Sequence, residues 1–380
     1  MTNDQMPHKS TRRDFLTGKA LARVSGEAAP GRGEGAAVGP RDTGAETCLI
    51  RATRSAMACD FEVALNAGQY EQGTEAALRA LDLVDALEDE LSYFRPDSQI
   101  SRINRTAHLE PVALEPPLFE LLELALRIHA ETEGAWDITA TPLWEAWGFA
   151  RRAARPPTPE QLAEARAAVG SQWIELDPQR RTIFLKRPGV RLNLGSIGKG
   201  HALDRAAALL TEAGVGDFLF HAGQSSVAAR GRPWVARDAA GGARPGWSVG
   251  IRHPLRPEEQ LAEVLLEDCA LGTSGSRFQF FRHRGRRFGH ILDPRTGQPA
   301  EGVLQATVVA PSAAVADALS TAFYVMGPEK ARDYCRTRPE IAALLVCPSS
   351  EGSAVEVITM GFPEKSLCLA RGGPGRPAAS

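Results

Sequence analysis

Apolar residues recur at helical spacing in several parts of the chain. Leu78, Leu81, Val84, Leu87 and Leu91 fall at intervals of three and four residues opposite a charged face. This spacing predicts an amphipathic helix over residues 73–91. The same pattern predicts further helices over residues 116–133, 159–169, 199–213 and 313–325.

Shorter apolar runs that end at turn residues predict strands. Trp173–Leu176 and Thr182–Leu185 flank the turn sequence Asp177–Arg180, which predicts a β-hairpin. Other strands are expected at residues 48–54, 60–65, 218–220, 227–229, 247–251, 264–266, 305–309, 342–346 and 355–359. Strands and helices alternate irregularly, without an internal repeat. We therefore predict a single α+β domain over residues 47–368, with mixed or antiparallel sheets and packed helices.

The two ends of the chain differ in composition from this domain. Ser10–Leu16 resembles a twin-arginine export signal, but Lys19, Arg23 and Glu27 interrupt the apolar run that should follow. We predict a disordered tail over residues 1–46 that carries a degenerate signal, and a second disordered tail over 369–380. A cytoplasmic location is favoured on this basis, with the periplasm as the alternative.

Composition excludes several classes of protein. The chain is 43% hydrophobic and 24% charged, and its net charge is −2 with Lys and Arg spread throughout, so no nucleic-acid surface is predicted. No apolar run approaches the roughly 18 residues of a transmembrane helix. The six cysteines form no CxxC pair, which favours reduced thiols over a disulfide framework or a zinc site.

Candidate chemistry begins with Asn193–Gly200, which carries three glycines and Lys199 at a predicted loop-to-helix junction. Helix N-termini attract anions, and glycines allow a phosphate to approach the backbone closely. The segment therefore predicts a phosphate-binding loop, although a tight turn with a surface lysine explains the same residues.

Two further candidates are a metal site and a general base. Asp317 and Thr321 lie four residues apart on a predicted helix, so their oxygen atoms share a face, which suits Mg²⁺. The alternative is an Asp that favours the helix dipole and a Thr that bonds its own backbone. His290 ends an expected strand and precedes a turn-rich segment, and it could act as a general base or be a loop histidine bonded to backbone.

Aromatic and small polar residues complete the set of candidates. Trp136, Trp144, Trp147 and Phe149, like Tyr93 and Phe94, could face a flat ring or belong to the core. Asp137 could accept a hydrogen bond from a ligand or cap Thr139. Thr273–Ser276 is interpreted as a small polar loop, either a phosphate contact or a turn.

Taken in their order along the chain, these segments are similar to the ApbE family of FAD:protein FMN transferases. The resemblance covers roughly residues 50–360 and lies in the combination of motifs. It implies a single T-fold-like catalytic unit that splits the pyrophosphate of FAD with the help of Mg²⁺. FMN would pass to a Thr or Ser of an acceptor flavoprotein subunit, and AMP would be released.

The resemblance also implies residue roles. Asp317 and Thr321 match the family's metal ligands, completed by the backbone near Ser196, and His290 matches the residue that deprotonates the acceptor hydroxyl. Positions that match the FAD site are Met57, Phe94, Ala135, Trp136, Asp137, Asn193, Lys199 and Ile291.

The sequence departs from the family pattern in four places. Met57-Ala58-Cys59 replaces Met-Gly-Thr, Asn193 replaces Asp, Ala222-Gly223-Gln224 replaces Gly-Gly-Asp, and Phe94 replaces Tyr. These changes affect the FAD contacts more than the metal site. Two alternatives therefore stand beside the transferase: a non-catalytic flavin-binding protein, and a pyrophosphatase that hydrolyses FAD to FMN and AMP.

Overall fold

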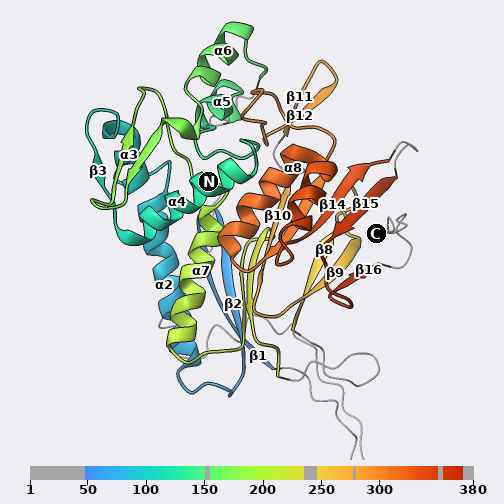
Figure 1. Ribbon diagram of the computed structural model, residues 1–380. Coiled ribbons are helices and arrows are strands. Elements are labelled where there is room, and N and C mark those ends of the chain that lie inside the picture. Colours follow the sequence, from blue (N-terminus) through green and yellow to red (C-terminus); the bar gives the residue numbers. More distant parts are fainter. Residues whose placement is uncertain (1–47, 150–154, 235–245, 277–279, 350–353, 371–380) are drawn as a thin grey trace, which may run out of the picture. The chain divides into compact units, whose positions relative to one another are not determined.

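A computed structural model describes residues 48–149, 155–234, 246–276, 280–349 and 354–370. Its central element is an eight-stranded sheet in the order β1-β2-β6-β7-β10-β13-β14-β15, in which every neighbouring pair is antiparallel (Figure 1). The strands are β1 (Leu49–Ala56), β2 (Cys59–Asn66), β6 (Phe218–Ala222), β7 (Ser226–Arg230), β10 (Ala270–Gly275), β13 (Gln305–Ala310), β14 (Ala342–Pro348) and β15 (Val355–Met360).

Three helices pack on one face of this sheet: α2 (Gly73–Leu91), α7 (Gly198–Glu212) and α8 (Ala313–Arg336). Side chains alternate across a strand, so one strand can serve two cores. In β14, Ala343 and Leu345 pack toward these helices, whereas Leu344 and Val346 pack on the opposite face. This explains why β14 is apolar along almost its whole length.

A smaller sheet covers the opposite face. Its strands are β8 (Trp247–Arg252), β9 (Gln260–Leu266) and β16 (Leu367–Leu369), in the order β16-β9-β8. Trp247, Ile251 and Leu266 form the second core together with the outward side chains of β7, β10, β14 and β15. The molecule is therefore layered, with helices, a large sheet and a small sheet in succession.

The remaining elements gather near one end of the large sheet (Figure 1). A small core of Leu143, Trp147, Ala165 and Leu292 joins two of the helices to the segment after residue 290. The elements are α3 (Gln99–Thr106), β3 (Val112–Ala113), α4 (Pro116–Glu131), α5 (Thr141–Ala146), α6 (Pro159–Ala167), the 3₁₀ turn η3 (Ser171–Trp173), β4 (Ile174–Asp177), β5 (Thr182–Leu185), β11 (Phe280–His283) and β12 (Arg286–Gly289).

The predicted α+β class with antiparallel sheets is confirmed, and the helix expected at residues 73–91 has those bounds. The helix expected at 313–325 continues to Arg336 across a break at Gly327, which has a φ of 79° and precedes Pro328. The interpretation of Thr273–Ser276 as a loop is wrong. Thr273–Gly275 end strand β10, where Ala306 and Thr307 of β13 pair with them.

None of the helices in the described ranges is long and apolar enough to cross a membrane. The residues of the export-signal prediction, 10–16, lie outside the described ranges, as do residues 371–380 of the predicted C-terminal tail.

The β1–β2 turn carries a strained alanine. Met57 and Ala58 both have positive φ, 49° and 61°, which is the backbone of a type I′ hairpin turn. A residue with a Cβ atom is disfavoured in this region, and glycine is not. We expect Ala58→Gly to raise the free energy of unfolding by about 1 kcal/mol in denaturant titrations. Ala56→Gly, two residues earlier in β1, should lower it, and a loss of stability in Ala58→Gly would contradict this account.

Candidate active site

A cavity of about 670 Å³ is lined by residues of α5, the start of α7, strand β10, helix α8 and the segment around His290. Eleven of the twelve site residues expected from the sequence line it: Phe94, Ala135, Trp136, Asp137, Asn193, Ser196, Lys199, His290, Ile291, Asp317 and Thr321. Met57 does not. It packs against the main core, and its neighbour Ala58 takes the place on the cavity wall. Segments spread over more than 200 residues of sequence therefore converge on one site.

Two glycines let α8 reach this position. A Cβ atom on Gly200 would lie 2.2 Å from the carbonyl oxygen of Ala313, and one on Gly272 would lie 2.5 Å from the carbonyl of Ala316. The start of α8 thus contacts both the start of α7 and strand β10 through bare backbone. This close approach places Asp317, one turn into α8, beside the first residues of α7.

Oxygen atoms cluster around Asp317. The hydroxyl of Ser274 lies 2.8 Å from that of Thr321 and 2.9 Å from that of Ser320. Ser320 donates to the carbonyl oxygen of Asp317, and the backbone N–H of Gly200 donates to the Asp317 carboxylate at 2.8 Å. Asp317 and Thr321 do share a face, as predicted. Ser320 was missed, although its three-residue spacing from Asp317 places it on nearly the same face.

The Asp317 carboxylate is buried and forms no ion pair within 4 Å among the described residues, although the Lys199 ammonium acts on it from further away. Burial raises its pKa to about 7, although the Lys199 ammonium and the Ser226 hydroxyl act in the opposite direction. A cation would stabilise the charged form of such a group.

The donor chemistry fits Mg²⁺ better than zinc. No group of three or more His, Cys, Asp or Glu side chains with the arrangement of a metal site occurs within the described ranges. The cluster offers one carboxylate and several hydroxyls, and Mg²⁺ characteristically takes one or two carboxylates together with water and substrate phosphates. In this cluster the oxygen atoms belong to Asp317, Thr321 and Ser274.

Some backbone N–H groups of the glycine segment, residues 193–200, are already hydrogen-bonded within the protein. The Asn193 side chain accepts from the N–H of Gly195 at 2.9 Å, and the N–H of Gly200 is bonded to Asp317. Fewer amides are therefore open to a phosphate than the sequence suggested. What remains is the start of α7 and Lys199, whose ammonium lies 2.5 Å from the hydroxyl of Ser225.

The aromatic residues divide between rim and core. Phe94 lines the cavity yet is 68% exposed, and its ring contacts those of Tyr93 and Trp144 edge-on. Tyr93 is fixed by a 2.6 Å hydrogen bond to Glu145. Trp136 and Trp147 are buried, the first donating from its indole N–H to the Ser196 hydroxyl at 3.0 Å. Phe94 is thus the aromatic most open to a flat ligand.

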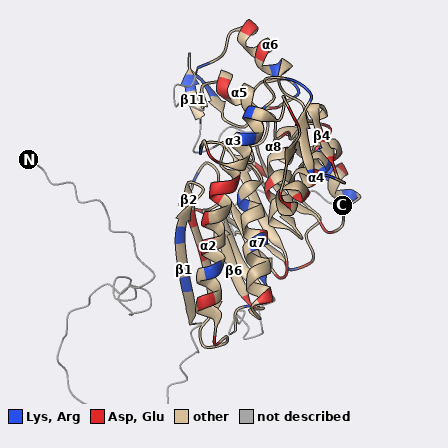
Figure 2. Ribbon diagram, turned by 90° about the vertical axis from the view of Figure 1, so that its left-hand side faces the viewer, with Lys and Arg blue, Asp and Glu red and all other residues tan. Residues whose placement is uncertain are grey.

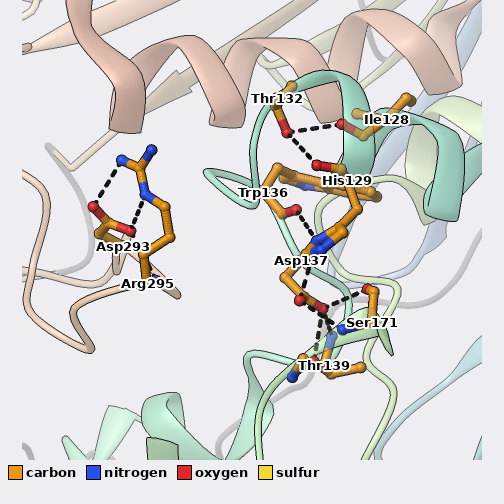
Figure 3. A network of polar contacts seen from close by, with 10 residues as sticks. Ile128, His129, Thr132, Trp136, Asp137, Thr139, Ser171, Asp293 and Arg295 are labelled. Carbon is orange, nitrogen blue, oxygen red and sulfur yellow. Dashed lines mark hydrogen bonds and ion pairs between the residues drawn. The ribbon is translucent and has the colours of Figure 1, made fainter. Parts of the chain in front are cut away.

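The carboxylate of Asp137 is hydrogen-bonded to other residues of the protein (Figure 3). Its carboxylate accepts from the backbone and hydroxyl of Thr139 and from the backbone and hydroxyl of Ser171, all within 3.0 Å. His129 adds an ion pair at 3.1 Å. Because the side chain is only 2% exposed, Asp137 shapes the cavity wall by holding its backbone. Of the two interpretations from the sequence, the cap on Thr139 is the one realised.

The His129–Asp137 pair makes a pH-dependent contribution to stability. Burial lowers the pKa of His129, but its hydrogen bond and charge interaction with Asp137 outweigh burial and raise it. Burial likewise raises the pKa of Asp137, and His129 and Thr139 reverse this to a net lowering. Both shifts favour the charged pair in the folded state.

We therefore expect His129→Asn to cost most stability in mildly acidic solution. A raised histidine pKa contributes stability that is complete below the unfolded value of about 6.5 and is lost as pH rises through the folded value. On the acid side, the contribution of Asp137 is lost as pH falls through its lowered pKa. Urea titrations of both proteins at several pH values measure the difference, and a difference that grows with rising pH would refute the pairing.

His290 lies on the cavity wall directly after β12. Its ring is 6.5 Å from that of Phe149, which it meets edge-on. The turn-rich loop predicted after it is confirmed, because the N–H groups of Thr296 and Gly297 both donate to the carbonyl oxygen of Asp293. A histidine in this position can exchange a proton with a group in the cavity.

Known proteins are similar to this chain in sequence and fold. An FAD:protein FMN transferase of Klebsiella pneumoniae is 31% identical over 293 residues, which cover 74% of this chain and 80% of that protein. One of Escherichia coli is 32% identical over 67% of this chain and 71% of its own length. The crystal structure of an ApbE protein from Thermotoga maritima superposes with a TM-score of 0.71 at 27% identity, covering 81% of this chain and 96% of that one.

The flavin transferase ApbE from Vibrio cholerae superposes with a TM-score of 0.69 at 26% identity, over 81% of this chain and 96% of that one. The sequence profile of the ApbE family matches residues 57–345, which include every residue of the candidate site. On this evidence the chain belongs to the ApbE family.

Proposed function

We propose that this protein transfers FMN from FAD to a Thr or Ser hydroxyl of an acceptor flavoprotein subunit, with Mg²⁺ bound at Asp317 and Thr321, and releases AMP. The observation that carries the proposal is the convergence in one cavity of an oxygen-ligand cluster, a lysine at a helix start and a histidine. Family membership supports the transfer of FMN from FAD to a protein, since the relatives are named for that activity.

Different residues of the cavity suit the ring systems and the pyrophosphate of FAD. The exposed ring of Phe94 suits one of the flat ring systems of FAD, and Lys199 at the start of α7 suits its pyrophosphate. Mg²⁺, when bound, would neutralise charge on the pyrophosphate and on the leaving AMP. Asp137 holds the backbone of the cavity wall through its hydrogen bonds to Thr139 and Ser171. The Trp136 indole fixes the Ser196 side chain.

The reaction is a substitution at phosphorus. The acceptor oxygen forms a bond to the FMN phosphorus, the bond from that phosphorus to the bridging oxygen breaks, and AMP leaves with that oxygen and its electron pair. The hydroxyl proton passes to His290, which we propose as the general base. Lys199 orients the phosphates.

The experiment that tests the proposal measures both products. The protein is incubated with FAD, Mg²⁺ and a candidate flavoprotein subunit, and AMP and gel-resolved flavin fluorescence are quantified. We expect one AMP for each covalent flavin, and loss of both on chelation with EDTA. AMP release without covalent flavin would contradict the transferase and indicate an FAD pyrophosphatase. Bound flavin without either product would indicate a non-catalytic flavin-binding protein.

A further inference from the structure

The β11–β12 hairpin concentrates positive charge in a chain whose net charge is −2. Between Phe280 and Gly289 the sequence holds no acidic residue, and its basic side chains are all exposed. Figure 2 shows this basic colouring around β11, beside α5. The basic residues are Arg282, His283, Arg284, Arg286 and Arg287.

The hairpin is anchored on aromatic residues beside the cavity. Phe281 and Phe288 stack on each other with centroids 5.2 Å apart, and Trp147 lies 5.5 Å from Phe288. Phe149 bridges the anchor to the cavity wall, since its ring is 5.6 Å from Phe281 and 6.5 Å from His290. The base of the hairpin is thus held next to the residue proposed to deprotonate the acceptor.

Two of the arginines interact with other residues of the protein. Arg286 forms an ion pair with Glu301, and Arg287 lies over the ring of Phe280 and donates to the carbonyl oxygen of Ser276. Neither Arg282 nor Arg284 has a carboxylate within ion-pair distance in the described ranges. Their charge is therefore available to a binding partner.

We propose that the β11–β12 hairpin docks the acceptor protein, and that the acceptor presents an acidic segment close to its accepting hydroxyl. This inference rests on the proposed function. The groups that would face FAD, Lys199 and the oxygen cluster at Asp317, line the cavity and lie on other elements. The acceptor is a macromolecule that must cover the rim while its hydroxyl reaches His290, and clustered arginines recognise acidic segments and steer their approach.

The observations favour a protein over a nucleic acid as the partner. A nucleic-acid surface generally shows a basic stripe or face within a basic domain. Here the exposed, unpaired cations of this hairpin sit in a chain of slightly negative net charge. A short acidic segment of a protein matches that limited footprint.

The test uses charge reversal at the hairpin and at a matched hairpin elsewhere. Arg282→Glu/Arg284→Glu reverses the proposed surface. Arg180→Glu/Arg181→Glu makes the same change at the exposed β4–β5 turn, which does not line the cavity. The probes are three fluorescein-labelled peptides with one central Thr, flanked by Asp and Glu, by Gln and Ser, or by Lys. Anisotropy is read with the full-length protein at low and at physiological salt.

We expect the acidic peptide to bind the wild type and the β4–β5 control equally, and the hairpin variant about 10-fold more weakly or worse at low salt. The hairpin variant should in turn prefer the lysine peptide. Equal affinity of the acidic peptide for all three proteins would overturn the proposal. So would tighter binding of duplex RNA or of phosphatidylglycerol vesicles that is lost in the same variant, since the surface would then serve another polyanion.

A separate measurement distinguishes this inference from the proposed function. FAD binding, followed by quenching of flavin fluorescence, should be unchanged in both variants, because neither pair lines the cavity. A wild type that binds the acidic peptide but forms no covalent flavin with any acceptor would refute the transferase and leave the peptide result intact. Transfer that persists at the full rate in the hairpin variant at subsaturating acceptor would refute only the docking surface.

Discussion

Asp317→Asn is expected to lower the rate of FMN transfer by about three orders of magnitude, the equivalent of roughly 4 kcal/mol at the transition state. The asparagine keeps the size of the side chain and an oxygen that can accept from the N–H of Gly200, so the contact between α7 and α8 persists. What is lost is the single carboxylate of the oxygen cluster. Initial rates at increasing Mg²⁺ measure the effect, which high Mg²⁺ should relieve only in part.

Asp217→Asn is the matched control for this prediction. Asp217 also accepts several hydrogen bonds, among them those from the Tyr70 hydroxyl and the N–H of Arg232, but it lies away from the cavity. We expect a modest loss of stability and an unchanged transfer rate. A fully active Asp317→Asn protein would remove the metal role, and equal inactivation of both variants would point to misfolding.

His290→Ala should lower the transfer rate by about two to four orders of magnitude and leave FAD binding nearly intact. The ring belongs to the wall where we expect the acceptor hydroxyl, and the oxygen cluster and Lys199 lie on other elements. The substitution thus removes the proton acceptor from the reaction and leaves the proposed phosphate contacts in place. Single-turnover transfer and FAD fluorescence quenching measure the two quantities separately.

The control here is His108→Ala, in the turn after α3 and outside the cavity. It should change neither the rate nor FAD binding. A His290→Ala protein that transfers FMN at the wild-type rate would refute the general-base role, whereas one that no longer binds FAD would assign His290 to the substrate site.

The sequence predicted most of the fold because its long elements carry regular patterns. The apolar residues of α2 recur without interruption, and its bounds were predicted correctly. Strand β10 was missed because Gly272–Gly275 is small and polar. It becomes a strand through pairing with β7 and β13, which are distant in sequence. Of the β11–β12 hairpin, only the strand that leads to His290 was expected. The rest was missed because charged residues dominate the hairpin, and aromatic packing holds it in place.

The site was predictable where residue spacing alone carries the geometry. Asp317 and Thr321 share a helical face by periodicity, and the structure places them in the cavity. Ser274 and Ser226 join them only through the sheet, which no local pattern reveals. The role of Asp137 depends on Ser171 and His129, one distant in sequence and one on the preceding helix, so the sequence left its ligand and cap interpretations open.

The central claim is the covalent transfer of FMN, and mass spectrometry of the acceptor tests it most directly. A candidate flavoprotein subunit is co-expressed with this chain, with Asp317→Asn, or alone, and its intact mass and flavin-bearing peptide are determined. The account predicts a mass gain of one FMN less one water on a single Thr or Ser, present only with the wild-type chain. Unchanged acceptor mass, with FMN and AMP accumulating free in solution, would contradict it.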